Sequence, residues 1–342
     1  MEKITLIHGS GGKESAVLMQ NVFAKHFQNE ILKRLEDSAV FPLPDPCSGL
    51  AVSTDSFVVT PLCFPGGDIG KLAVYGTVND VLMSGAEPRY LTCGFIIEAG
   101  LSINMLDSIC SSMASAAKEA GVKIIAGDTK VIEGHSEDGG LMINTTGIGL
   151  VRNDGSLAPS PSGIHPGDAI LVSGKLGDHH AAILSARMGI KNSIKSDCAL
   201  LAPITEALKK EGINIHAMRD VTRGGLGTVL NELAIASDIV IEIEEDFIPV
   251  GAEVRSFCGV MGLDPLYMGN EGKMVLAVVP EDAEKAITSI KKTEIGSEVT
   301  LIGYASEKEK PKDAMTYVIM HTRIGGTVRI DSLFGEGLPR IC

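Results

Sequence analysis

The residue with the most evident chemistry is Cys342, the last in the sequence. Its own terminal carboxylate disfavours the thiolate unless a cation offsets it, and Arg340 stands close by. A single thiol on a tether suggests a group carrier, whose sulfur is loaded in one place and moved to another. Glycines between residues 325 and 337 would allow hinge motion, and Pro339 stiffens the approach. The alternative is a frayed end, since chain termini are usually poorly ordered.

Carboxylates form a second group of candidate functional-site residues. Asp55 interrupts an apolar segment, and a carboxylate buried there requires a metal or a dense set of hydrogen bonds. Asp80 falls within a predicted helix over 71–84, where the alternative is a solvated helix residue. Asp128 and Lys130 come just beyond a predicted buried strand over 122–126, a position that suits a site.

Three glycine-rich segments resemble anion-binding turns. The one at residues 8–13 lacks the Walker A spacing, and a flexible arm is the alternative. The segment at 64–71 also fails to match the Walker A pattern, because Leu72 follows its lysine. Gly224 and Gly225 precede a predicted helix, whose free N–H groups would attract an anion, although Thr222 could simply cap that helix. At residues 177–180, we favour capping of a helix by Asp178 over metal binding by the adjacent histidines.

Composition narrows the function classes. The 342 residues include 30 Lys and Arg against 43 Asp and Glu, a net charge of −13, which argues against nucleic acid or an anionic membrane as partner. No apolar run approaches the roughly 20 residues of a membrane span. The 7 cysteines are scattered without a C-x-x-C pair, which is typical of reduced thiols in the cytoplasm.

The predicted elements alternate between strands and helices in two sets. The first set has strands at 50–59, 89–98, 122–126 and 141–151, with helices at 71–84 and 103–120. A Pro/Ser/Gly stretch at 154–163 marks a domain boundary. The second set follows it, with strands at 168–173, 239–244, 274–279, 299–304 and 315–321 and a helix at 281–292. We therefore expect an N-terminal arm and helix at 1–40, an α/β domain at 41–153, an α+β domain at 154–324 and a flexible tail at 325–342.

Several segments together resemble one family, the HypE family of hydrogenase maturation proteins, over nearly the whole chain. It belongs to the superfamily of aminoimidazole ribonucleotide synthetase, selenophosphate synthetase and thiamine-phosphate kinase. The segments carrying the resemblance are TDSF at 54–57, FPGGDIGK at 64–71, GTVND at 76–80, GDTK at 127–130, TRGGL at 222–226, NEGK at 270–273 and PRIC at 339–342.

The resemblance implies a fold, an activity and partners. The N-terminal α/β domain would form a β-barrel across a homodimer, beside a C-terminal α+β domain, with ATP in the cleft between them. A HypF-type carbamoyltransferase would load a carbamoyl group on Cys342. The protein would then use ATP to dehydrate it to a thiocyanate, and the cyanide would pass through a HypC–HypD scaffold to the iron of a [NiFe] hydrogenase.

The same resemblance assigns roles to residues. Phosphoryl transfer needs charge neutralisation, usually by Mg²⁺ held on carboxylates, here Asp55, Asp68, Asp80, Asp128 and Asp220. Glu271 and Lys130 are the candidates for taking protons from the carbamoyl nitrogen. The residues expected to bind the nucleotide are Gly9, Ser10, Gly11, Gly12, Gly67, Lys71, Asn79, Thr129, Gly224 and Gly225.

Two departures and two rival readings accompany this assignment. The family often has Gly-Asp-His-Gly where this chain has Gly177-Asp178-His179-His180, and residues 334–338 match only loosely. One rival is an ATP-dependent phosphotransferase that acts on a free metabolite. The other is a non-enzymatic carrier that only presents Cys342 to partners.

Overall fold

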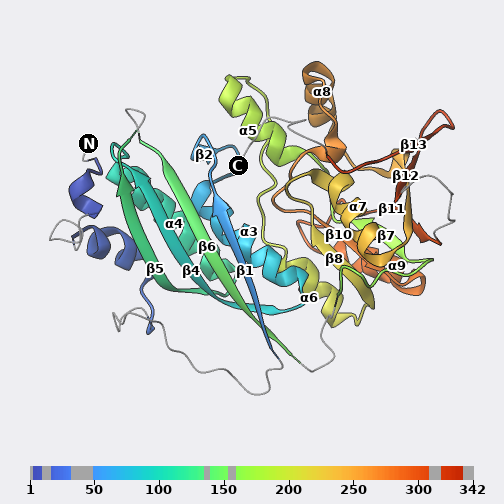
Figure 1. Cartoon of the computed structure of the whole chain (residues 1–342), viewed down its shortest axis with the longest axis horizontal. Coiled ribbons are helices and arrows are strands. Elements are labelled where there is room, and N and C mark those ends of the chain that lie inside the picture. Colours follow the sequence, from blue (N-terminus) through green and yellow to red (C-terminus); the bar gives the residue numbers. More distant parts are fainter. Residues whose placement is uncertain are drawn as a thin grey trace. The chain divides into compact units, whose positions relative to one another are not determined.

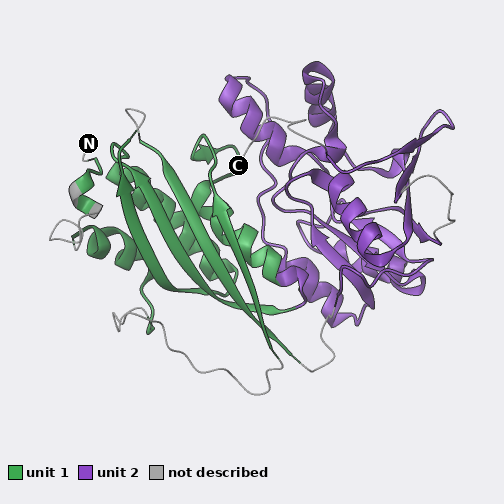
Figure 2. Ribbon diagram, in the orientation of Figure 1, with its two compact units in different colours: residues 1–81, 86–154, 341–342 green, residues 82–85, 155–340 purple. Residues whose placement is uncertain are grey.

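The computed structural model describes residues 3–9, 17–31, 49–134, 139–152, 159–307 and 317–333. The chain divides into two compact units (Figure 2). Unit 1 comprises residues 1–81, 86–154 and 341–342, and unit 2 comprises residues 82–85 and 155–340. Among the described residues, no helix has the length and apolar character that a bilayer span requires.

Unit 1 is built on a four-stranded sheet in the order β1-β6-β4-β5. Antiparallel pairing joins β1 to β6 and β6 to β4, whereas β4 and β5 are parallel. Figure 1 shows helices α3 and α4 on one face of this sheet. The strands are β1 (Gly49–Phe57), β4 (Glu87–Glu98), β5 (Lys123–Ile132) and β6 (Leu141–Val151), and the helices are α3 (Ile69–Met83) and α4 (Ile103–Glu119).

The two faces of this sheet differ, and the sequence explains why. Alternate residues of β1 are exposed, and its last inward residue, Phe57, is buried. Helix α3 lies directly on the backbone of β6, because a Cβ at Gly149 would come within 2.4 Å of Val81. We call the face under α3 and α4 the inner face and the opposite face the outer face.

Short elements complete unit 1. A hairpin of two short antiparallel strands precedes α3. Three short helical segments lie near the N-terminus. These elements are β2 (Cys63–Phe64), β3 (Gly67–Asp68), η1 (Leu6–Gly9), η2 (Met19–Ala24) and α2 (Lys25–Phe27). Phe27 of this region stacks with Phe95 of β4, and Phe23 packs against the same ring at a tilted angle.

Unit 2 contains a seven-stranded sheet in the order β13-β12-β9-β11-β7-β10-β8. Its strand β10, which lies between β7 and β8, has an unbroken buried run, which is typical of a strand covered on both faces. The strands are β7 (Ala169–Val172), β8 (Ile215–Asp220), β9 (Val240–Glu244), β10 (Met274–Val278), β11 (Thr300–Ser306), β12 (Val318–His321) and β13 (Thr327–Arg329).

Five α-helices and three short 3-10 helices accompany the described part of this sheet. They are α5 (Asp178–Met188), α6 (Ala202–Lys210), α7 (Gly225–Ser237), α8 (Ala252–Met261), α9 (Ala283–Ile290), η4 (Glu245–Phe247), η5 (Pro265–Tyr267) and η6 (Pro280–Asp282). Leucine, valine and alanine side chains of α7 join the buried core of the unit.

The structure confirms most predicted strands and helices and corrects three details. Strand β5 does not end near residue 126 but continues to Ile132, because its parallel pairing with β4 persists. Asp178 does not cap α5 with its side chain, since Gly177 holds the cap position. Elements α6, α8, β2, β3, β8 and β13 were not predicted. In the described part of a single chain neither sheet closes into a barrel, so a barrel across two chains stays a prediction.

Candidate functional site

Strand β1 and helix α3 bring two of the predicted metal ligands to one layer. Ser53 Oγ donates a hydrogen bond of 2.6 Å to Asp80 Oδ2 on α3. Asp55 lies two residues further along β1 and so shares the inner face with Ser53. Its register partner Thr145 also points to α3, where its hydroxyl donates to Ala73 O at 2.9 Å. Asp55 and Asp80 therefore line the same side of the sheet.

The turn before α3 is organised by Asp68. Its Oδ1 accepts hydrogen bonds from the backbone N–H groups of Gly70 and Lys71, at 2.8 and 3.0 Å. Its Oδ2 accepts from Ser112 Oγ of α4 at 2.6 Å. The carboxylate thus occupies the anion-binding end of the helix itself. Gly67 lies in β3, and Lys71 Nζ sits 5.4 Å from the centre of the Tyr75 ring.

Asp128 and Lys130 lie within β5 and not beyond its end. They form an exposed ion pair with 3.0 Å between Lys130 Nζ and Asp128 Oδ2. The hydrogen bond from Lys130 lowers the pKa of Asp128, assisted by the Thr129 backbone. The parallel register pairs Asp128 with Gly94 and Lys130 with Ile96, both on the outer face. The sheet therefore separates this pair from Asp55 and Asp80, whereas Thr129 faces inward.

In unit 2, the NEGK turn is held by Asn270, which is fully buried. Its Oδ1 accepts from Gly177 N at 2.7 Å, and its Nδ2 donates to Val221 O and Met268 O at 2.9 and 3.0 Å. All of its side-chain groups are engaged, so the turn is rigid. Asn270 also fixes the backbone position of the next residue, Glu271.

A charged cluster surrounds the same turn. Asp197 Oδ1 accepts a hydrogen bond of 3.1 Å from Glu271 N, and its Oδ2 lies 3.3 Å from Lys273 Nζ. Burial, and secondly the charge of Asp197, raises the pKa of Asp178 to about 6. Carboxyl groups with a displaced pKa in such a cluster are candidates for proton transfer.

Two buried histidines of α5 adjoin this cluster. Burial lowers the pKa of His179 to about 4. Burial, and secondly the repulsion that a protonated His179 exerts, lowers the pKa of His180 to about 4 as well. His179 Nδ1 contacts Ser196 Oγ at 2.8 Å. Both rings are therefore neutral near pH 7, and both belong to the core of unit 2.

Sequence reasoning missed Asp197 and Lys273 as members of the cluster. Lys273 is the last residue of the NEGK segment, so the motif itself could have identified it. Asp197 belongs to a stretch without helix or strand, where periodicity gives no information.

The glycine pair before α7 meets a packing requirement. Gly224 and Gly225 both have positive φ, and a Cβ at Gly225 would come within 2.4 Å of Leu266 O. The N–H of Gly225 already donates to Thr222 O at 3.0 Å. Thr222 makes no side-chain cap here, because Gly224 is the cap residue.

The remaining predicted residues are placed as follows. Asn79 is buried within α3, and Asp220 is buried at the end of β8. Gly9 closes η1. Ser10, Gly11, Gly12 and Cys342 lie outside the described residues.

Nearly the whole chain is similar to known proteins. Residues 35–151 match the family model "AIR synthase related protein, N-terminal domain", and residues 165–314 match its C-terminal counterpart. The chain is 43% identical over 348 residues to carbamoyl dehydratase HypE of Azotobacter vinelandii, covering 99% of this chain and 97% of that protein.

Two solved structures share this architecture. One is hydrogenase maturation protein HypE in complex with ATP, with a TM-score of 0.91, 46% identity and coverage of 98% of this chain and 99% of that one. The other is a HypE–HypF complex, with a TM-score of 0.77, 43% identity and coverage of 92% and 99%.

Proposed function

This chain belongs to the HypE family of hydrogenase maturation proteins, and from that membership we propose that it dehydrates an S-carbamoyl group on Cys342 to a thiocyanate. The observation that carries the proposal is full-length similarity to carbamoyl dehydratases, together with similarity to a structure that holds ATP. The thiocyanate would supply cyanide for the iron of a [NiFe] hydrogenase.

The reaction balances as a phosphorylation followed by an elimination. The carbamoyl oxygen attacks the γ-phosphorus of ATP, ADP leaves, and the nitrogen gives up one proton. Phosphate then departs with that oxygen as the nitrogen loses its second proton, which leaves the S–C≡N group. An amide oxygen is a poor leaving group and a phosphate is a good one, so ATP makes the loss of water feasible.

The described residues suggest how the chain would serve these steps. Oxygen ligands suit Mg²⁺, and Asp55 and Asp80 share the inner face where they could hold it. Asp68 already bonds through both oxygens, which favours a structural role at the start of α3. Glu271 remains the proposed proton acceptor, because Asn270 and Asp197 fix its backbone.

Partners follow from the same family membership. A relative forms a complex with HypF, so we assign the loading of Cys342 to a HypF-type carbamoyltransferase. A HypC–HypD scaffold would receive the cyanide, and a homodimer would form through the outer face of unit 1. The five cysteines within the described residues are free thiols, which supports a reducing cytoplasmic location.

Mass spectrometry of the C-terminal peptide tests the proposal. The tail is first carbamoylated with the carbamoyltransferase system, which is then removed, and ATP with Mg²⁺ is added. We expect the peptide to lose the mass of one water only when nucleotide is present.

Cys342→Ala should abolish the modification, and Cys63→Ala is the matched control, because Cys63 is an exposed thiol outside the tail. Modification that maps to Cys63, or water loss at full rate without ATP, would show the proposal to be wrong.

A further inference from the structure

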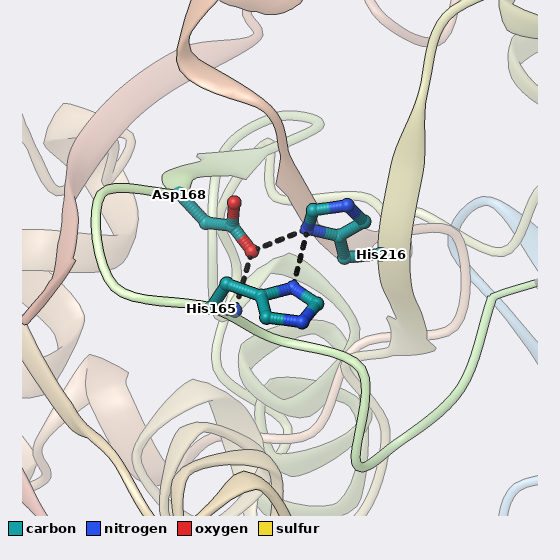
Figure 3. A group of neighbouring side chains, drawn as sticks. All are labelled: His165, Asp168 and His216. Carbon is teal, nitrogen blue, oxygen red and sulfur yellow. Dashed lines mark hydrogen bonds and ion pairs between the residues drawn. The ribbon is translucent and has the colours of Figure 1, made fainter.

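Three metal-ligating side chains meet at the start of β7, in unit 2. They are His165, Asp168 and His216, and Figure 3 shows their polar atoms turned toward one another. Asp168 Oδ2 lies 2.7 Å from His216 Nδ1, and the Nδ1 atoms of the two histidines are 3.2 Å apart. One ligand atom from each residue lies within 4.8 Å of the others.

A tight turn holds two of these residues. Asp168 N donates to His165 O at 3.1 Å, and His165 N donates back to Asp168 Oδ2 at 2.8 Å. Pro166 and Gly167 occupy the middle of the turn, and Gly167 has a φ of 96°, as a type II turn requires. The positions of His165 and Asp168 are therefore fixed by the backbone.

A β-bulge supplies the third residue. Val278 of β10 pairs with Ala169 on one side and with Ile215 on the other, which brings the starts of β7 and β8 to the same end of the sheet. The register then shifts, so that Ala277 pairs with Ala217 and His216 is the extra residue. Bulges redirect side chains, and this one accompanies the placement of His216 beside Asp168.

The hydrogen bonding of the cluster is unevenly matched. His216 Nδ1 faces both the carboxylate and the other imidazole, and a single N–H cannot serve both well. Asp168 is only 2% exposed, and no lysine or arginine among the described residues forms a salt bridge with it. A cation in place of the shared proton would satisfy all three atoms and balance the buried charge.

We propose that His165, Asp168 and His216 bind one divalent first-row transition-metal ion, with Zn²⁺ as the reference ion. Two imidazoles and one carboxylate favour such an ion over Mg²⁺, which prefers oxygen ligands. Because His165 is exposed, the ion can enter from solvent, and water can complete its coordination. This site is separate from the residues proposed for Mg²⁺, and it would clamp the start of β7 to β8.

Zinc titration by calorimetry, on protein whose thiols are alkylated, tests this site. We expect one Zn²⁺ per chain and a higher melting temperature with zinc. His165→Gln, Asp168→Asn and His216→Gln should each weaken binding by about 100-fold or more, because loss of even an outer-shell partner costs a metal site 10–100-fold. Bound Co²⁺ should show the visible absorption of nitrogen and oxygen ligation.

His321→Gln is the matched control. His321 also pairs with a carboxylate, with 3.1 Å to Glu242 Oε2, but the described residues place no second imidazole beside it. This variant should bind zinc as the unsubstituted chain does. The proposal is overturned if the unsubstituted chain binds no zinc at micromolar concentration, or if His321→Gln loses binding equally. Because His165 is exposed, its variant decides the question even if Asp168→Asn fails to fold.

Discussion

Ser53 Oγ and Asp80 Oδ2 are 2.6 Å apart, and this hydrogen bond joins strand β1 to helix α3. The donor orients one oxygen of a carboxylate that we assign to Mg²⁺. Asp55 is two residues from Ser53 on the same face. One strand therefore supplies both a proposed ligand and the group that positions the other.

Asp80→Asn should keep the fold and lower the rate of water loss by about 100-fold, because an amide is a weaker ligand and carries no charge to neutralise. Ser53→Ala should lower it by about tenfold, since one hydrogen bond to a charged group is lost. Single-turnover mass spectrometry of the carbamoylated tail measures both rates.

Ser56→Ala is the control for these two variants, because Ser56 lies on the outer face of the same strand, where Asn144 Nδ2 donates to it at 3.0 Å. Turnover by Asp80→Asn at the unsubstituted rate would remove Asp80 from the site.

The sequence predicted best where burial is regular. Strand β6 and helix α4 were predicted nearly to their ends, because alternating and three-to-four-residue apolar spacing reflect a single buried face. The end of β5 was misplaced, since the edge strand becomes polar while its pairing continues. Which face a carboxylate occupies depends on register, so the separation of Asp128 from Asp80 could not be deduced from spacing. Neither could the bulge at His216.

Asp178→Asn should stabilise the protein at pH 8 by about 1–2 kcal/mol, a figure reduced for the exposed part of the side chain. The pKa of Asp178 is raised to about 6 from 3.8. As pH rises between these values, Asp178 loses its proton in the unfolded chain before it does so in the folded chain, so the free energy of unfolding falls. This loss of stability is complete above about pH 6, where Asp178 is ionised in both states.

Urea denaturation at pH 4 and pH 8 measures this difference. The variant and the unsubstituted protein should have similar stability at pH 4. An equal gain at both pH values would exclude titration of Asp178 as the cause.

Asn270→Ala should destabilise the protein by about 2–4 kcal/mol, because it leaves Gly177 N and Met268 O without their buried partner. It also removes one of the two donors to Val221 O, which keeps the backbone N–H of residue 270. Asn192→Ala is the control and should cost less than about 1 kcal/mol. Asn192 is exposed, so water can replace the hydrogen bond that its Nδ2 donates to Ser185 Oγ. Urea unfolding measures both.

Glu271→Gln, in contrast, should keep stability and ATP binding while turnover is lost. That contrast separates the residue that positions the turn from the one proposed to accept a proton. Full turnover by Glu271→Gln would exclude it as the acceptor.

Val52→Lys should convert a dimer into a monomer. Val52 is 65% exposed on the outer face of β1, and Ile96 on β4 is 41% exposed on the same face. Apolar side chains on an open sheet favour burial against a second copy, and a lysine there would carry its charge into the interface. Sedimentation velocity at micromolar concentration should show a dimer for the unsubstituted chain and a monomer for the variant.

Val260→Lys is the control, because Val260 is 86% exposed but belongs to α8 of unit 2. A monomeric unsubstituted chain would contradict the dimer, and dissociation by Val260→Lys would show that the outer face of unit 1 is not its specific interface.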